Sequence, residues 1–132
     1  MKILEGKNIL LADDDAYNIF ALTAALEDFG VNITSVTNGI DAVNAVTAEG
    51  GTDIVLMDIM MPDMDGYEAI RTIRSKGFHH LPIIALTAKA MRGDIEKCLE
   101  AGASDYMPKP IDVARLVEMM ASWLEKTQSR PS

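Results

Sequence analysis

The sequence predicts an α/β fold in which a doubly wound, parallel sheet of five strands is covered by five helices. Short apolar runs alternate with segments of helical periodicity along the whole chain, and Gly or Pro residues separate them. Each apolar run and the helical segment after it have together the length of one βα unit. Because crossovers between parallel strands are nearly always right-handed, such units place helices on both faces of one sheet.

The first two predicted units each join a short strand to an amphipathic helix. The first strand covers residues 8–12. The helix after it ends at a glycine and carries apolar side chains at helical spacing, namely Ile19, Leu22, Leu26 and Phe29. The second strand covers residues 31–36, and an Asn-Gly pair then turns the chain into a helix over residues 40–48.

The third and fourth predicted units have strands that end on a polar residue. The third strand covers residues 54–57 and ends at Asp58, and the fourth covers residues 82–86 and ends at Thr87. The helices that follow them cover residues 67–75 and 91–101. In the second of these helices, the spacing places Met91, Ile95, Cys98 and Leu99 on one face, and Met91 is interpreted as a core or partner-facing residue.

The fifth predicted unit is a short strand followed by a longer helix. The strand covers residues 105–107 and leads to Lys109-Pro110. Asp112 is a suitable N-cap for the last helix, because its carboxylate can accept a hydrogen bond from a free N–H of the first turn. The buried stripe predicted for this helix is Leu116, Val117, Met120, Trp123 and Leu124.

The length and composition predict one domain over residues 1–132, with a core of about residues 7–124 and a short polar tail at residues 125–132. A total of 12 Lys and Arg against 20 Asp and Glu gives a net charge of -8, which would repel nucleic acids and anionic membranes. The apolar run of the first strand is far too short to span a membrane. Cys98 is the single cysteine, so it cannot form an internal disulfide and is interpreted as a core residue. We therefore expect a cytoplasmic protein without nucleic-acid or membrane partners.

Polar side chains follow four of the predicted strands at the point where each strand ends. They are Asp13 and Asp14 after the first strand, Asp58 after the third, Thr87 after the fourth and Lys109 after the fifth. Because the carboxyl ends of parallel strands lie at one edge of the sheet, we expect these side chains to meet in the crevice where such folds bind ligands. Taken singly, each residue is more typical of a turn, a strand end or a surface position. Their joint placement indicates a functional site.

The three carboxylates at this edge would repel one another unless a cation neutralised them. Mg2+ is the expected cofactor, because it is small and hard, prefers carboxylate and water ligands, and accepts a phosphoryl oxygen as a further ligand. The expected ligands are Asp13, Asp14, Asp58 and the backbone carbonyl of Met60. Phosphoryl transfer also requires an oxygen nucleophile and groups that stabilise the transferred oxygens. This requirement assigns Asp58 as the nucleophile, with Lys109 and Thr87 as the stabilising groups.

Four segments of the chain resemble the response-regulator receiver family, in the order and spacing of that family. They are NILLADDDAYN, DIVLMDIMMPDMDGYEAI, LPIIALTAKA and GASDYMPKPID. The resemblance covers about residues 7–124 and implies a flavodoxin-like sheet of strand order 2-1-3-4-5, with a cis peptide bond before Pro110. It also implies roles for individual residues. These are Asp13 and Asp14 as the acidic pair, Asp58 as the phosphoacceptor, Thr87 as the switch hydroxyl, Tyr106 as the rotating switch aromatic and Lys109 as the lysine of the family.

The resemblance implies a function in phosphorelay signalling. A histidine kinase or a histidine phosphotransfer protein would donate the phosphoryl group from a phosphohistidine, and the domain would catalyse its own phosphorylation and dephosphorylation as a switch rather than as a turnover enzyme. The amino-acid sequence most resembles those of receivers attached to hybrid histidine kinases. Met60 and Lys89 occupy the positions where the resemblance places control over the phosphoryl lifetime. The oligomeric state, the cognate kinase and the parent protein stay open.

Two other functions are compatible with parts of the pattern. A magnesium phosphatase of the haloacid-dehalogenase type also uses an aspartyl nucleophile after its first strand, but the residues that follow Asp15 here, Ala16 and Tyr17, match its motif only in part. A flavodoxin-like binding protein would share the predicted sheet, but the acidic loop at Asp13 would repel a flavin phosphate.

Two further motifs favour a structural interpretation. Part of the calcium-binding loop motif of EF-hands is matched by Asp63, Asp65 and Gly66. However, when Gly66 is aligned with the glycine of that motif, a methionine falls at the first ligand position and a threonine at the last. His79 and His80 lie in a predicted loop without further metal ligands. We therefore expect them to be exposed histidines with no metal.

Overall fold

The computed structural model describes residues 2–49, 51–88 and 91–128 of the chain. Within these residues, five parallel strands form one sheet in the order β2-β1-β3-β4-β5. The strands are β1 (Asn8–Ala12), β2 (Asn32–Val36), β3 (Ile54–Asp58), β4 (Ile83–Thr87) and β5 (Asp105–Pro108). The helices are the short 3-10 helix η1 (Lys2–Leu4), α1 (Ala16–Glu27), α2 (Gly39–Glu49), α3 (Gly66–Ser75), α4 (Arg92–Ala101) and α5 (Val113–Gln128). The predicted fold and strand order are confirmed.

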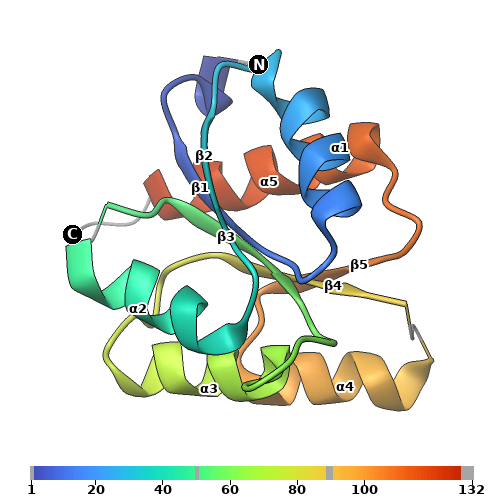
Figure 1. Cartoon of the computed structure of the whole chain (residues 1–132). Coiled ribbons are helices and arrows are strands. Elements are labelled where there is room, and N and C mark those ends of the chain that lie inside the picture. The colour runs from blue at the N-terminus through green and yellow to red at the C-terminus, as the bar shows by residue number, and fades with distance from the viewer. Residues whose placement is uncertain (1, 50, 89–90, 129–132) are drawn as a thin grey trace.

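Helices cover both faces of the sheet (Figure 1). α1 and α5 pack on one face, and α2, α3 and α4 pack on the other. The central strands β3 and β4 are buried at every position, as expected for parallel strands with helices on both sides. β2 lies at the edge of the sheet and is only partly covered.

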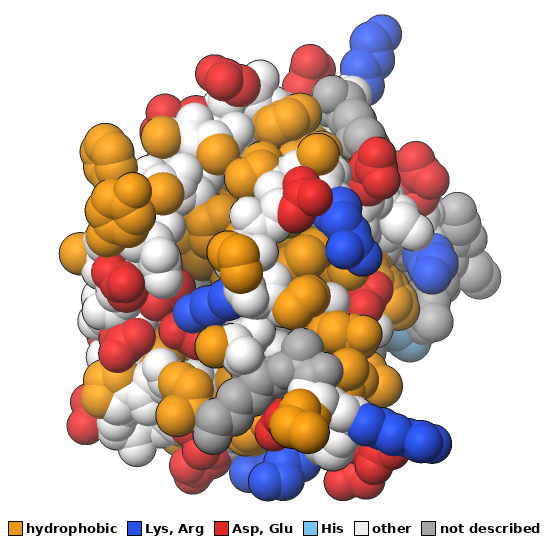
Figure 2. Space-filling model, turned by 90° about the vertical axis from the view of Figure 1, so that its right-hand side faces the viewer, with side chains coloured by type: hydrophobic (Ala, Val, Ile, Leu, Met, Phe, Trp, Pro, Cys, Tyr) orange, Lys and Arg blue, Asp and Glu red, His pale blue; other side chains and the backbone are white. Residues whose placement is uncertain are grey.

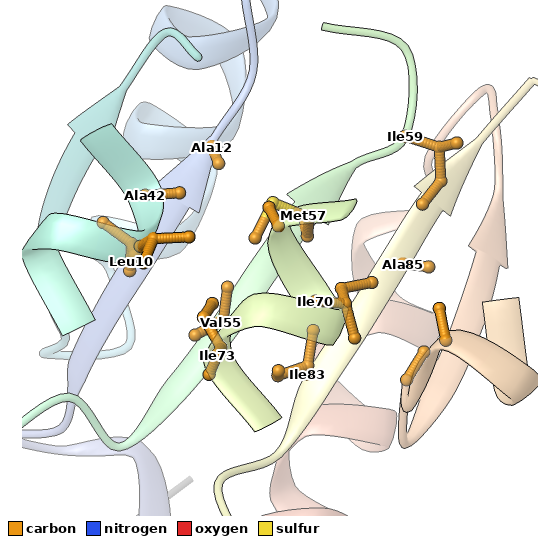
Figure 3. Close-up of a cluster of buried hydrophobic side chains, with 14 of the residues drawn as sticks. Leu10, Ala12, Ala42, Val55, Met57, Ile59, Ile70, Ile73, Ile83 and Ala85 are labelled. Carbon is orange, nitrogen blue, oxygen red and sulfur yellow. The ribbon is translucent and has the colours of Figure 1, made fainter. Parts of the chain in front are cut away.

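The apolar side chains form two clusters, one on each face of the sheet. The first cluster joins Leu10, Val55 and Met57 of the strands to Ile70 and Ile73 of α3 (Figure 3). The second cluster lies under α1 and α5. Its buried members from these two helices are Leu22, Leu26, Leu116, Val117, Met120 and Leu124. The predicted apolar stripes of both helices are thus confirmed for these residues.

Trp123 departs from the stripe predicted for the last helix. It is half-buried, and its indole N–H donates a hydrogen bond to Asp105 Oδ2 at 3.0 Å. The Nζ of Lys126 lies 4.3 Å from the centroid of the Trp123 ring. The indole is therefore placed by a polar partner and a cation at the border of the helix, as is common for an aromatic side chain with a polar tip.

The predicted apolar face of α4 is only partly buried. Cys98 is fully buried, as expected for a core residue, but Met91 and Leu99 are exposed and Ile95 is half-buried. α4 packs beside α3 and the short edge strand β5, so the surface that covers it is narrow. Helical spacing thus identified this face but not how much of it is buried, because burial depends on the width of the surface opposite.

Both ends of the described chain extend beyond the predicted core. Leu4 in η1 is fully buried and belongs to the cluster under α5, although the core was expected to begin near residue 7. α5 continues to Gln128, within the segment predicted as a polar tail, and residues 129–132 lie outside the described part. Of the helices that the structure describes, none is both long enough and apolar enough to cross a membrane.

Candidate active site

Asp13, Asp14 and Asp58 lie together at the edge of the sheet where β1 and β3 end. Asp58 is the last residue of β3, and Asp13 follows β1 directly. The parallel register pairs Ala12 with Met57, so Asp13 and Asp58 follow at neighbouring positions. Each of the three aspartates offers a carboxylate oxygen within 4.8 Å of the others. The acidic cluster predicted for this edge is therefore present in the folded chain.

Lys109 brings a positive charge to this cluster from the loop after β5. Its backbone N–H donates a hydrogen bond of 2.8 Å to the carbonyl of Thr87. A cis peptide bond joins Lys109 to Pro110, which is the isomer that the family resemblance implied. The Nζ of Lys109 lies 3.2 Å from Asp58 Oδ2 and 3.9 Å from Asp13 Oδ2. The ammonium group thus lies between two buried carboxylates.

Two of the three aspartates are buried, and burial is the largest influence on the pKa of Asp58. Asp13 is 1% exposed and Asp58 is 3% exposed, whereas Asp14 faces solvent. Burial raises the pKa of the Asp58 carboxyl above its ordinary value; Lys109 opposes this shift, and the charge of Asp13 adds to it. Asp13 Oδ1 accepts a hydrogen bond from the backbone N–H of Asp15 at 2.9 Å, but Asp13 Oδ2 has no hydrogen-bond partner among the described residues. A buried carboxylate oxygen in this state is costly, so the donor set fits a hard divalent cation.

The loop between β3 and α3 is held close to Asp58. Gly66 approaches the end of β3 so closely that a Cβ at this position would collide with the backbone oxygen of Asp58. The backbone N–H of Met60 donates to Asp58 Oδ1 at 3.2 Å, while the methionine itself is 62% exposed. Asp65 is the N-cap of α3 and accepts a hydrogen bond from its first turn. This cap supports the structural interpretation of the calcium-like sequence.

Thr87 and Tyr106 lie on neighbouring strands on the β5 side of the cluster. Thr87 is the buried last residue of β4, one position beyond the residue that pairs with Asp58. Tyr106 is half-buried and packs against the first hydrophobic cluster. In the register of β4 and β5, Thr87 lies two positions beyond the partner of Tyr106. Lys89, which was expected to influence the phosphoryl lifetime, lies outside the described residues.

The surface around the acidic cluster was not predicted. A groove beside Asp13 and Lys109 is lined by Leu22 of α1 and by Ile111 and Val113 near the start of α5. Figure 2 faces this edge of the sheet and shows acidic and basic side chains with hydrophobic ones around them. The exposed aromatic residues of α1 are Tyr17 and Phe20. In the sequence, this surface could have been recognised from two aromatic residues at positions of the helix that do not belong to its buried stripe.

His79 and His80 are exposed in the loop before β4, as expected from the sequence. In the part of the chain that the structure describes, Asp13, Asp14 and Asp58 form the one group of three or more potential metal ligands. The candidate metal ligands among the described residues therefore lie at the ends of β1 and β3.

Comparisons with known proteins agree with this geometry. The profile of the response regulator receiver domain matches residues 9–121. The sensor protein GacS of Pseudomonas syringae is 40% identical over 119 residues, which are 87% of this chain but only 13% of GacS. The crystal structure of the receiver domain of sensor histidine kinase PA1611 from Pseudomonas aeruginosa PAO1 is 40% identical, with a TM-score of 0.84, and covers 91% of this chain and 98% of that one. That structure has a magnesium ion coordinated in its active site cleft.

A further solved structure contains a partner. It is the co-crystal structure of the Saccharomyces cerevisiae histidine phosphotransfer signaling protein Ypd1 and the receiver domain of its downstream response regulator Ssk1. The similarity has 28% identity and a TM-score of 0.84, and covers 91% of this chain and 90% of that one. Matches over most of the chain favour a receiver over the phosphatase and flavin-binding alternatives. With the strand order, the acidic cluster and the profile in agreement, the chain belongs to the response regulator receiver domain family of two-component signalling.

Proposed function

We propose that this receiver domain accepts a phosphoryl group from a phosphohistidine onto Asp58, in a reaction that requires Mg2+. The observation that carries the proposal is the 3.2 Å contact between Lys109 Nζ and the buried Asp58 carboxylate, next to two further aspartates. A buried aspartate with one cation beside several carboxylates is a poor structural ion pair, because its charges are not balanced. The same arrangement is well suited to receive an anionic group together with a divalent cation.

Asp58 is the proposed nucleophile because both of its oxygens are already oriented. Its Oδ1 accepts from the Met60 N–H, and its Oδ2 contacts Lys109. Holding the attacking group in place removes part of the entropic cost of the transfer. A bond forms between an Asp58 oxygen and phosphorus as the bond from phosphorus to the donor histidine nitrogen breaks. The imidazole leaves with that electron pair and takes up a proton.

The proposed Mg2+ ligands are Asp13, Asp14, Asp58 and the backbone carbonyl of Met60. Support comes from the buried Oδ2 of Asp13, which lacks a hydrogen bond within the described residues. When bound, Mg2+ would neutralise the repulsion among the carboxylates and stabilise charge on the phosphoryl oxygens. Lys109 supplies the second positive charge from its own side of Asp58.

Thr87 and Tyr106 are the proposed switch. Thr87 would donate its hydroxyl to the phosphoryl group, and the space that it leaves would let Tyr106 turn inward. Because the two residues lie on adjacent strands, this movement would change the surface formed by β4, β5 and the helices beside them. A shift of only a few kcal/mol is enough to move such an equilibrium from mostly inactive to mostly active.

The proposed donor is a histidine kinase or a histidine phosphotransfer protein. The similarity to the receiver in the Ypd1 complex supports the second, and the similarity to GacS supports attachment to a hybrid kinase. The chain would act as a self-dephosphorylating switch and not as a turnover enzyme. Its net charge of -8 makes a nucleic-acid partner unfavourable, and its single cysteine suits the cytoplasm.

Phosphorylation with a small donor tests this function. The protein is incubated with Mg2+ and acetyl phosphate, trapped with borohydride and analysed by peptide mass spectrometry. The label should lie on Asp58, should be absent in Asp58→Asn and should disappear when EDTA removes the metal. The matched control is Asp63→Asn, since Asp63 is exposed and its φ of 67° is tolerated by asparagine. Label that persists in Asp58→Asn would contradict the assignment.

A further inference from the structure

We propose that Met60 is a site of oxidation by peroxide, and that its sulfoxide shortens the lifetime of a phosphoryl group on Asp58. The first part concerns only the thioether and its access to solvent. The second part rests on the proposed function, because it requires that Asp58 carries the phosphoryl group.

Met60 differs from most methionines of the chain in its exposure. The buried or half-buried methionines are Met57, Met61, Met64, Met107, Met119 and Met120. Met60 is 62% exposed and Met91 is 77% exposed. A dissolved oxidant reaches exposed thioethers first, so these two should react before the others described.

Met60 also differs from Met91 in its position relative to Asp58. The backbone N–H of Met60 donates to Asp58 Oδ1 at 3.2 Å, so its backbone is fixed against the phosphoacceptor. From there the side chain extends into solvent beside the acidic cluster. Met91 is the N-cap residue of α4 and belongs to a different loop. It therefore serves as a matched control with similar exposure.

The oxidation balances with hydrogen peroxide as the oxidant. The thioether sulfur attacks one peroxide oxygen, the O–O bond breaks, and a sulfur–oxygen bond forms. Sulfur loses two electrons, and the peroxide is reduced to water. The product is methionine sulfoxide, which cellular reductases can convert back to the thioether. The modification is therefore reversible.

Oxidation to the sulfoxide changes how the side chain can form hydrogen bonds with water. A thioether is a weak hydrogen-bond acceptor, whereas the sulfoxide oxygen is strongly polar. Hydrolysis of the acyl phosphate requires a water molecule in line with the bond from phosphorus to the Asp58 oxygen. An acceptor on a fixed backbone beside that bond orients such a water and increases the hydrolysis rate. Peroxide would thus accelerate loss of the phosphoryl group from Asp58 without acting on the donor kinase.

Peptide mapping tests the first part without any phosphorylation. The whole chain is treated with increasing hydrogen peroxide, and the gain of one oxygen is followed at each methionine by mass spectrometry. Met60 and Met91 should be oxidised before Met57, Met61 and Met120. Oxidation of Met60 that is no faster than that of the buried Met61 would overturn the proposal.

Decay measurements test the second part. The decay rate of the phosphoryl group is measured at saturating Mg2+ before and after mild oxidation. Each oxidised variant is compared with the same variant before oxidation. Oxidation should speed decay several-fold in wild type and in Met91→Leu, and should have no effect in Met60→Leu. Treatment of oxidised wild type with methionine sulfoxide reductase should restore slow decay. As a positive control, Met60→Asn carries a permanent polar amide at the same place and should decay about tenfold faster than wild type.

The outcomes separate the two proposals. Unchanged decay of oxidised wild type, or acceleration that persists in Met60→Leu, would overturn the lifetime effect while Asp58 phosphorylation stood. A protein that takes no label on Asp58 would overturn the proposed function and the lifetime effect together. Peptide mapping would still decide whether Met60 is the oxidation site.

Discussion

At the edge of the sheet where the strands begin, Arg74 donates hydrogen bonds to three backbone carbonyls and to the Ser104 hydroxyl. At the edge where the strands end, Asp13 Oδ2 is buried without a hydrogen bond among the described residues, and burial raises the pKa of Asp58. At the first edge Arg74 and its partners satisfy one another within the chain, whereas the second edge leaves a buried carboxylate oxygen that an added cation would satisfy. This difference separates a structural edge from a functional one, since buried polar groups are normally paired.

The substitution that should destabilise the structural edge most is Arg74→Ala. Its guanidinium joins the loop before β4 to the loop before β5, through the carbonyls of Phe78, Leu81 and Gly102 at 2.6, 2.7 and 2.9 Å. Removing it leaves these carbonyls with fewer partners, and we expect a loss of about 3 kcal/mol in the free energy of unfolding. Urea denaturation followed by circular dichroism measures this loss.

The matched control for this change is Arg71→Ala, because Arg71 is exposed on the same helix. A surface substitution of this kind should cost less than about 0.5 kcal/mol. Folded Arg74→Ala should still accept the phosphoryl group, since the acidic cluster lies at the opposite edge. Equal losses of stability in the two variants would mean that the hydrogen bonds of Arg74 add nothing to the fold.

The functional edge is best tested by comparing Asp14→Ala with Asp15→Ala. Asp14 belongs to the carboxylate cluster, whereas Asp15 is the N-cap of α1 and accepts from the Tyr17 N–H at 2.9 Å. Asp14→Ala should weaken Mg2+ binding by at least about tenfold, or roughly 1.4 kcal/mol. Asp15→Ala should leave the affinity nearly unchanged and instead lose about 1 kcal/mol of stability. Titration calorimetry measures both affinities, and equal losses would show that the acidic pair is misassigned.

The fold and the acidic cluster could be predicted because both follow from position along the chain. β3 and β4 are apolar over their central positions, and their end residues Asp58 and Thr87 interrupt this pattern. Once the strands are parallel, their ends must lie at one edge, so residues far apart in the sequence can be placed together. The resemblance to the receiver family added the cis peptide bond at Lys109-Pro110.

Other features could not be predicted, because a pattern shows that a residue is polar but not what it contacts. Arg74 looks like an ordinary charged residue of an amphipathic helix, and one of its partners, Ser104, is 30 positions away. The extent of burial along the apolar face of α4 could not be predicted for the same reason, since the exposure of Met91 and Leu99 depends on how much of the sheet lies opposite. The buried oxygen of Asp13 also became visible only in the folded chain.

The smallest expected effect concerns the stability of the functional edge itself. Without Mg2+, Asp58→Asn should be more stable than wild type at pH 7 by about 1 kcal/mol, because it removes a buried charge from a group of carboxylates. Asparagine has nearly the same shape and can still accept the Met60 N–H bond, and Lys109 keeps Asp13 as a charged neighbour 3.9 Å away.

The pH dependence of this advantage has a defined sign. Burial and Asp13 raise the folded pKa of Asp58 above the ordinary value of 3.8, even though Lys109 opposes them, so the folded protein binds a proton more tightly than the unfolded chain. The stability that this proton confers is fully present below the unfolded pKa and is lost as pH rises through the folded pKa. The asparagine side chain of the variant cannot titrate, so the advantage of Asp58→Asn should shrink as pH falls toward about 4. Urea midpoints of both proteins, measured in EDTA from neutral to acidic pH, follow this change. An advantage that grows on acidification would mean that Lys109 outweighs burial and that Asp58 forms a stabilising ion pair before any metal binds.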